Sequence, residues 1–96
     1  MNFKERFYYL RYFFDGYYNQ SYEDRLEDRF KDFIDLENEE FHNKLKKEIL
    51  VLEQIYYQKD LGTWQKIDEL VHEDSLRYLH YKDGLEFIKI AKKCLL

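Results

Sequence analysis

The residues whose type and spacing point most clearly to chemistry are four aspartates on one predicted helix. They are Asp24, Asp28, Asp32 and Asp35. Steps of four, four and three residues place them on one helix face, about 200° around the helix from Leu26 and Phe30, so they should point away from the core. A solvated face and a docking surface for a basic partner both remain open. A divalent-metal site is least favoured, because outward side chains of one helix do not converge.

Acidic residues are concentrated around this stripe. From Glu23 to Glu40 there are nine acids and three bases, so this window carries −6 while the whole chain carries −4. A nucleic-acid ligand requires a basic footprint. The charge therefore predicts no direct nucleic-acid binding and suits a basic protein partner.

The other potential ligands and nucleophiles show no recognisable arrangement. They are His42, His72, His80, Cys94, Ser21 and Ser75. No pair has the spacing of a zinc site, and no glycine-rich phosphate loop is present. Cys94 falls on an apolar face and is expected to be a buried thiol. We therefore predict no catalytic residue, no metal and no cofactor, and we do not expect an enzyme.

Aromatic residues are concentrated near the N-terminus, where twelve of the nineteen lie within the first 33 residues. Tyrosine is enriched at protein interfaces, because it buries a large area and keeps a hydroxyl group for bonding. The connection from Tyr17 to Tyr22 is therefore expected to supply partner-binding residues beside the acidic stripe. These are Tyr17, Tyr18, Gln20 and Tyr22.

The apolar spacing is helical throughout and predicts five helices. The first four are expected over residues 3–14, 22–36 and 39–59 and in a short segment after Thr63, and the last carries Leu85 to Leu95. Asn2, Ser21, Asn38 and Thr63 are the expected N-caps. Residues 72–81 stay unassigned. The predicted fold is all-α, a compact four- to five-helix bundle in a single domain over residues 1–96.

The three glycines suggest different roles. Gly16 and Gly62 are expected to end helices, because glycine readily adopts the left-handed conformation found there. For Gly84 two alternatives remain: a helix starts there with Asp83 as its cap, or a backbone packs closely against it.

Apolar runs are short, the longest being the four residues from Ile49 to Leu52. A membrane span needs about 20 apolar residues. No signal peptide is visible after Lys4, Glu5 and Arg6, and a single cysteine gives no disulfide framework. We expect a cytoplasmic protein without a membrane partner.

Two segments carry a resemblance to a known family. The first is the run from Phe7 to Tyr22, in which Phe7, Leu10, Gly16, Tyr17 and Gln20 occupy the conserved positions of a motif, with aromatic residues at Tyr18 and Tyr22. The second is Leu85-Glu86-Phe87 near the C-terminus. Together they resemble one family of immunity proteins from contact-dependent growth inhibition systems. Tyr8, Asn19, Ser21 and Gly84 depart from the family pattern.

The resemblance implies a small cytoplasmic protein that binds the toxin domain of a delivered effector, in a 1:1 complex, and blocks it. Many such toxins are nucleases with basic active faces, which an acidic, tyrosine-rich surface would fit. Two alternatives remain open. One is a phage anti-defence protein whose acidic face imitates nucleic acid. The other is a non-enzymatic helical interaction module, such as a homodimer.

Overall fold

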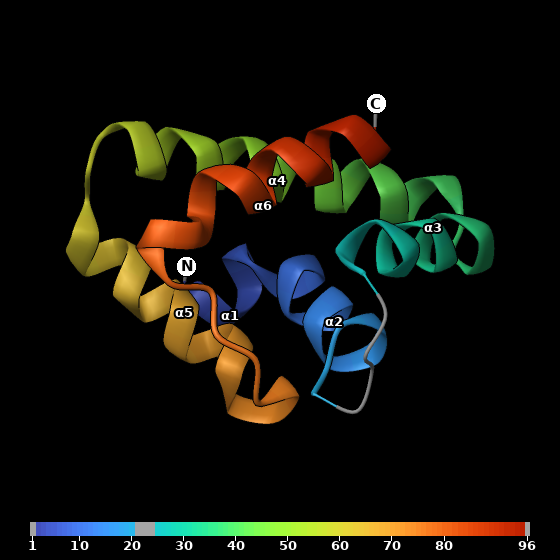
Figure 1. The fold of residues 1–96 in the computed structure, drawn as a ribbon, viewed down its shortest axis with the longest axis horizontal. Helices are drawn as coiled ribbons and strands as arrows, with labels where there is room; N and C mark the ends of the chain where they lie inside the picture. Colours follow the sequence, from blue (N-terminus) through green and yellow to red (C-terminus); the bar gives the residue numbers. More distant parts are fainter. Residues whose placement is uncertain (1, 21–24, 96) are drawn as a thin grey trace.

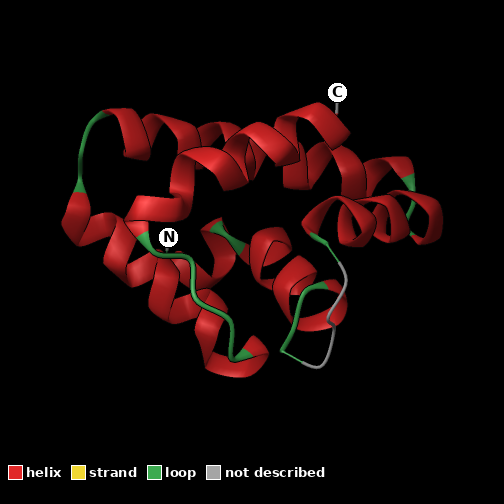
Figure 2. Ribbon diagram, viewed as in Figure 1, coloured by secondary structure: helices red, strands yellow, loops and turns green. Residues whose placement is uncertain are grey.

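The computed structural model describes residues 2–20 and 25–95, and these form helices and their connections without a strand (Figure 2). The helices are α1 (Phe3–Arg6), α2 (Tyr8–Tyr17), α3 (Leu26–Leu36), α4 (Glu39–Tyr57), α5 (Leu61–Ser75) and α6 (Tyr81–Leu95). The all-α prediction is confirmed. The described part of the chain has six helices rather than four or five, because the first predicted helix is divided at Phe7.

The helices pack in two layers. The long helices α4 and α6 lie side by side in one layer, and α1, α2 and α5 form the other, with α3 closing one end against α2 and α6 (Figure 1). No described helix is both long and apolar enough to cross a lipid bilayer. The radius of gyration is 12.2 Å, close to the value of about 12.5 Å expected for a compact chain of this length.

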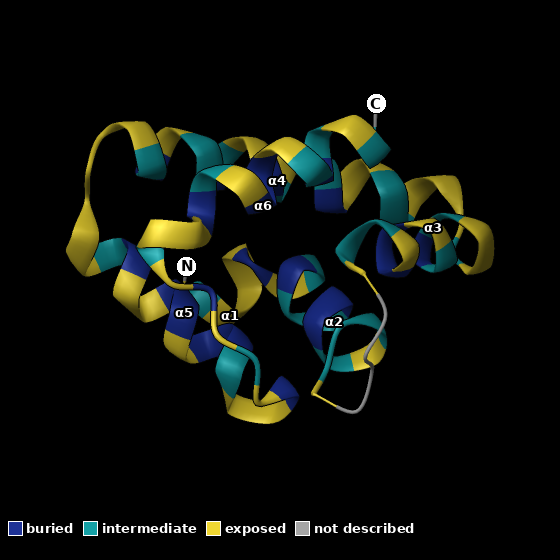
Figure 3. Cartoon of the chain, viewed as in Figure 1, coloured by how far each residue is buried: buried dark blue, intermediate teal, exposed yellow. Residues whose placement is uncertain are grey.

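The core lies where the two layers meet, and phenylalanine fills its centre. Phe13 stacks on Phe30 with a centroid separation of 4.2 Å, and it meets Phe33 edge-on at 5.8 Å. Phe14 reaches Phe87 at 5.5 Å. Buried positions on α2, α4, α5 and α6 face this centre (Figure 3). The predicted apolar stripes therefore do form the core.

The first helix differs from its prediction at both ends. Asn2 caps α1 as expected, its side chain accepting a hydrogen bond from the Glu5 N–H. The helix then breaks at Phe7, and α2 continues through Gly16 to Tyr17. The prediction that Gly16 ends the helix is wrong. No glycine among the described residues has a positive φ.

A side chain from another helix explains the break at Phe7. The carboxylate of Glu48 on α4 accepts hydrogen bonds from the N–H groups of Tyr9 and Leu10, at 3.1 and 2.7 Å. These two donors lie in the first turn of α2, where no intrahelical partner exists. Glu48 thus caps α2 from a distance of about forty residues in sequence.

Burial raises the pKa of Glu48 to about 7 from its ordinary value of 4.5, although the two N–H donors act in the opposite direction. Between these values the folded protein holds a proton that the unfolded chain has released. The contribution of Glu48 to the free energy of unfolding is therefore fully present below about pH 4.5 and is lost as the pH rises through about 7. We expect the free energy of unfolding to fall by about 1–2 kcal/mol over this interval, allowing for partial contact with water.

Urea unfolding between pH 4.5 and 8 measures this dependence. Glu48→Gln should lose this part of the slope, since an amide does not titrate. Glu69→Gln, at an exposed position on α5, should retain the slope of the native chain. An unchanged slope in Glu48→Gln would assign the titration to another group.

The predicted cap of α4 is confirmed, and that of α5 is wrong. The Asn38 side chain accepts from the Phe41 N–H. At the next junction Lys59 takes the left-handed conformation, with φ of 57°. Asp60 then caps α5, accepting from both the N–H and the hydroxyl group of Thr63. Gly62, the predicted stop, instead lies in the first turn of α5.

Residues 72–81, for which the sequence predicts no structure, begin as helix and continue as a connection that we call the strap. Helix α5 reaches Ser75, and Leu76 ends it in the left-handed conformation. The strap over residues 76–80 is held at Leu79, whose N–H donates to Asp68 at 2.6 Å and whose carbonyl accepts from Trp64 at 2.6 Å. The strap therefore carries the chain across α5 to the start of α6.

Gly84 does lie at a close contact, but with a side chain rather than the predicted backbone. Gly84 lies within α6, and a Cβ atom placed there would lie 2.6 Å from two atoms of the Trp64 ring. Asp83 is accordingly part of the helix and not its cap. The missing side chain lets α6 approach the indole of α5.

Candidate partner-binding surface

The acidic stripe of α3 faces outward as predicted. Asp28 and Asp35 are exposed, and Asp32 is half-exposed and forms an ion pair with Arg29. Asp24 lies outside the described residues. The outward face of α3 therefore keeps two fully exposed carboxylates and one that shares its charge with an arginine.

The arginines of α3 compensate this charge only in part. Arg29 is just 6% exposed, and its guanidinium also donates to the Tyr17 carbonyl at 3.4 Å. Arg25 pairs with Glu27 at 2.8 Å. Among the described residues, neither Asp28 nor Asp35 has an ion-pair partner.

The turn between α3 and α4 extends the negative surface. Glu39 and Glu40 are exposed in the first turn of α4. Glu37, the C-cap of α3, accepts hydrogen bonds from the hydroxyl groups of Tyr12 and Tyr17 at 2.8 and 2.5 Å. We call the exposed carboxylates of this region the acidic surface; they belong to Asp28, Asp32, Asp35, Glu39 and Glu40.

Of the predicted partner-binding tyrosines, Tyr17 and Tyr18 are half-buried and pack against other side chains of the same chain. Tyr17 stacks on Phe13, and burial together with its hydrogen bond to Glu37 raises the pKa of its phenol. Tyr18 packs on Phe14, with the Arg77 guanidinium 4.1 Å above its ring. Both rings therefore have intramolecular packing roles.

The other two predicted residues of this connection give less information. Gln20 is exposed, and its N–H donates to the Ser75 carbonyl at 2.9 Å. Tyr22 lies outside the described residues. The structure therefore brings Tyr17 close to α3 but does not gather Tyr17, Tyr18 and Gln20 into one exposed patch.

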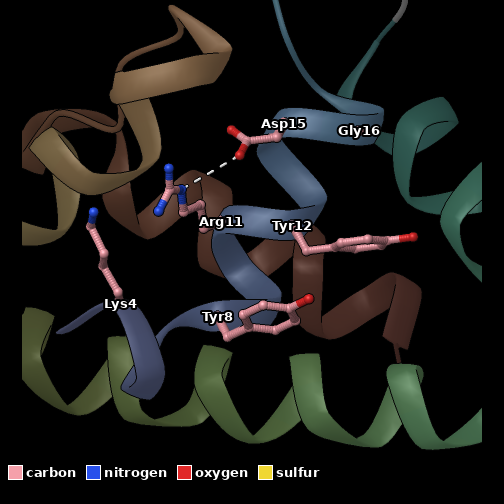
Figure 4. Close-up of a pocket in the computed structure, with 6 residues that line it drawn as sticks. All are labelled: Lys4, Tyr8, Arg11, Tyr12, Asp15 and Gly16. Atoms are coloured by element: carbon pink, nitrogen blue, oxygen red, sulfur yellow. Dashed lines mark ion pairs between the residues drawn. The ribbon is translucent and has the colours of Figure 1, made fainter. Parts of the chain in front are cut away.

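A tyrosine pair outside the predicted partner-binding residues lies on the outer face of α2. Tyr8 is 53% exposed and stacks on Tyr12, with ring centroids 6.4 Å apart. The two rings form one side of an open groove of about 440 Å³. Its lining residues are Lys4, Tyr8, Arg11, Tyr12, Asp15 and Gly16 (Figure 4). The spacing of Tyr8 and Tyr12, opposite Leu10 and Phe14 on the same helix, was the available signal.

The histidines and the cysteine are placed in structural contacts. Tyr78 stacks between His72 and His80, at 4.0 and 4.7 Å. His80 also lies 3.2 Å from the buried carboxylate of Asp68. Cys94 is half-buried, so the expected full burial is wrong, and partial desolvation raises the pKa of its thiol. Within residues 2–20 and 25–95, no three His, Cys, Asp or Glu side chains group as a metal site would require.

Comparison with known proteins gave no match to a family model, to a curated protein or to a solved structure. The likeness to immunity proteins thus rests on the two sequence motifs alone.

Proposed function

We propose that this protein is an immunity protein. It binds the toxin domain of a contact-dependent growth inhibition effector, most simply a nuclease, and covers the toxin's basic face. The two exposed carboxylates of Asp28 and Asp35, which form no ion pair among residues 2–20 and 25–95, carry this proposal. A basic toxin face would supply the missing positive charge, and complementary charge accelerates association.

The acidic surface suits binding better than folding. Carboxylates four residues apart on a helix repel one another and cost about 0.2–0.5 kcal/mol per pair. Asp28 and Asp32 form such a pair, and Arg29 relieves only one of them. A surface of this kind lowers the stability of the free protein slightly and gains energy when a cationic partner arrives.

Neutralising the stripe should weaken the complex without unfolding the protein. We expect the triple variant Asp28→Asn, Asp32→Asn, Asp35→Asn to associate about tenfold more slowly with the toxin domain encoded by the neighbouring gene. The association rate of the native chain should fall steeply with salt, because exposed charges are screened beyond about 10 Å at 0.1 M. Co-purification in a 1:1 complex, followed by stopped-flow association at low and high salt, measures both effects.

A control variant with the same change in net charge distinguishes the effect of the acidic surface on the association rate from the effect of overall charge. Glu5, Glu69 and Glu86 are exposed acids on other helices, α1, α5 and α6. Their simultaneous replacement by glutamine should change the association rate by less than about twofold. Equal slowing in both triple variants, or no slowing in either, would contradict a docking role for α3.

A further inference from the structure

Gly16 occupies a position that the fold itself does not explain. It lies in the last turn of α2 without a positive φ, and a Cβ atom placed there would have no atom within 4 Å. A glycine inside a helix is less favourable than alanine. Gly84, by contrast, is required by the contact with Trp64. The open space above Gly16 is therefore available to something outside the chain.

This space belongs to the groove on α2, whose aromatic side consists of the exposed Tyr8 ring and the half-buried Tyr12 ring. The stacked rings of Tyr8 and Tyr12 rise from α2 on the side toward α3, while Arg11 and Asp15 extend toward α5 (Figure 4). A planar or extended group crossing at Gly16 would contact a tyrosine ring on one side and a carboxylate on the other.

The charge on the carboxylate side favours a cation. Arg11 is the single guanidinium among three acids, lying 2.6 Å from Asp74, 3.5 Å from Asp15 and 3.9 Å from Glu73. The second oxygen of Asp15, Oδ1, is buried and finds no donor among the described residues. Burial and the nearby charge of Asp74 raise the pKa of Asp15, as expected where positive charge is in short supply.

Lys4 restricts where that cation would lie. It lines the groove at the end nearer α1, away from Asp15 and Gly16 (Figure 4). A second cation would be repelled there and attracted at the Gly16 end.

We propose that the groove on α2 binds an arginine side chain of a basic partner protein, with the partner's backbone crossing α2 at Gly16. A guanidinium is planar, stacks on aromatic faces and pairs with carboxylates in a fixed geometry, which suits it better than an ammonium group. The chain already contains one such contact, in which Arg77 lies over the Tyr18 ring.

The groove lies close to the C-terminal end of α3. Tyr12 stacks on Tyr8 and donates its hydroxyl hydrogen to Glu37, at the C-terminal end of α3. A partner that contacts the turn after α3 would therefore lie near the groove. In this respect the groove rests on the proposed function and adds a second contact surface for the same partner.

The test uses a small probe, the capped tripeptide Gly-Arg-Gly, observed by residue-resolved NMR. The chemical-shift changes on adding this peptide should be largest at the Gly16 amide and at the Tyr8 and Tyr12 rings. They should be weaker with Gly-Lys-Gly and absent with Gly-Gln-Gly. Gly16→Gln fills the open space with a residue that favours helix, so it should keep the fold and weaken peptide binding at least about tenfold. The matched variant Asp35→Asn on α3 should leave the Gly16 shift unchanged.

The outcomes separate this proposal from the proposed function. Shifts centred on α3, equal shifts with the glutamine peptide, or native binding by Gly16→Gln would overturn the groove, even if the toxin domain still binds through α3. Shifts centred on Gly16 that Gly16→Gln abolishes would support the groove, even if no toxin domain binds.

Discussion

Replacing Phe13 with alanine is expected to lower the free energy of unfolding by about 3–5 kcal/mol, the largest effect of any substitution considered for this protein. Phe13 is fully buried, and its ring stacks on Phe30 at 4.2 Å. It also packs against Phe33 and Tyr17, so this side chain helps to join α2 to α3. Alanine would leave a cavity that the neighbouring rings of Phe30, Phe33 and Tyr17 cannot fill.

Urea unfolding monitored by circular dichroism measures this loss. Since domains of this size are stable by only about 5–15 kcal/mol, part of the Phe13→Ala population should be unfolded at 37 °C. Tyr8→Ala removes an aromatic ring from the opposite face of the same helix and should cost less than about 1 kcal/mol. Similar losses in the two variants would show that Phe13 is not the centre of the core.

Replacing Gly84 with alanine is expected to destabilise the protein by about 2–3 kcal/mol. A Cβ atom there would lie 2.6 Å from the Trp64 ring and 3.3 Å from Tyr56. The indole cannot easily retreat, because its N–H is bonded to the Leu79 carbonyl and its ring packs against Tyr81. Either α6 moves outward or the strap loses its anchor.

Gly16→Ala provides the matched control and should have the opposite sign. The same added methyl group meets no atom at Gly16, so the helix should gain up to about 1 kcal/mol. Thermal unfolding should therefore show a lower midpoint for Gly84→Ala and a higher one for Gly16→Ala, each 1 kcal/mol corresponding to about 4–8 °C. Two shifts of the same sign would contradict the different surroundings of the two glycines.

Local signals were sufficient to predict much of the fold. Asn2 and Asn38 were recognised as N-caps because the bond that each makes spans only three residues. The apolar positions of α4, such as Leu45, Ile49 and Leu52, follow helical spacing and are buried. Where helix formation and its limits depend on neighbouring residues, the sequence is a reliable guide.

Long-range contacts account for the main errors. The break at Phe7 is stabilised by Glu48, and nothing near Phe7 in sequence announces that carboxylate. Gly16 permits a left-handed helix end but does not require one, and tertiary packing carries α2 past it. The strap between α5 and α6 is fixed by Asp68 and Trp64, which lie more than ten residues earlier.

In the candidate site, too, some features follow from local sequence and others from long-range contacts. The outward phase of Asp28, Asp32 and Asp35 follows from helix geometry alone. The fates of Tyr17 and Tyr18 do not, since burial of an aromatic ring depends on what α3 and the strap bring beside it. Tyr8 stays exposed, whereas Tyr12 is half-buried beside Phe41 of α4, which lies far away in sequence.

Trp64 gives the molecule a built-in optical reporter. It is the single tryptophan, buried between Tyr56 and Tyr81 at centroid distances of 5.9 and 5.6 Å. Light absorbed by these tyrosines should be passed to the indole and emitted at the short wavelengths of an apolar environment. Separation of α6 from α5 would shift this emission to the red, whereas a partner seated on α2 or α3 would leave its wavelength unchanged. Fluorescence can thus distinguish opening of the bundle from occupation of its surface in one sample.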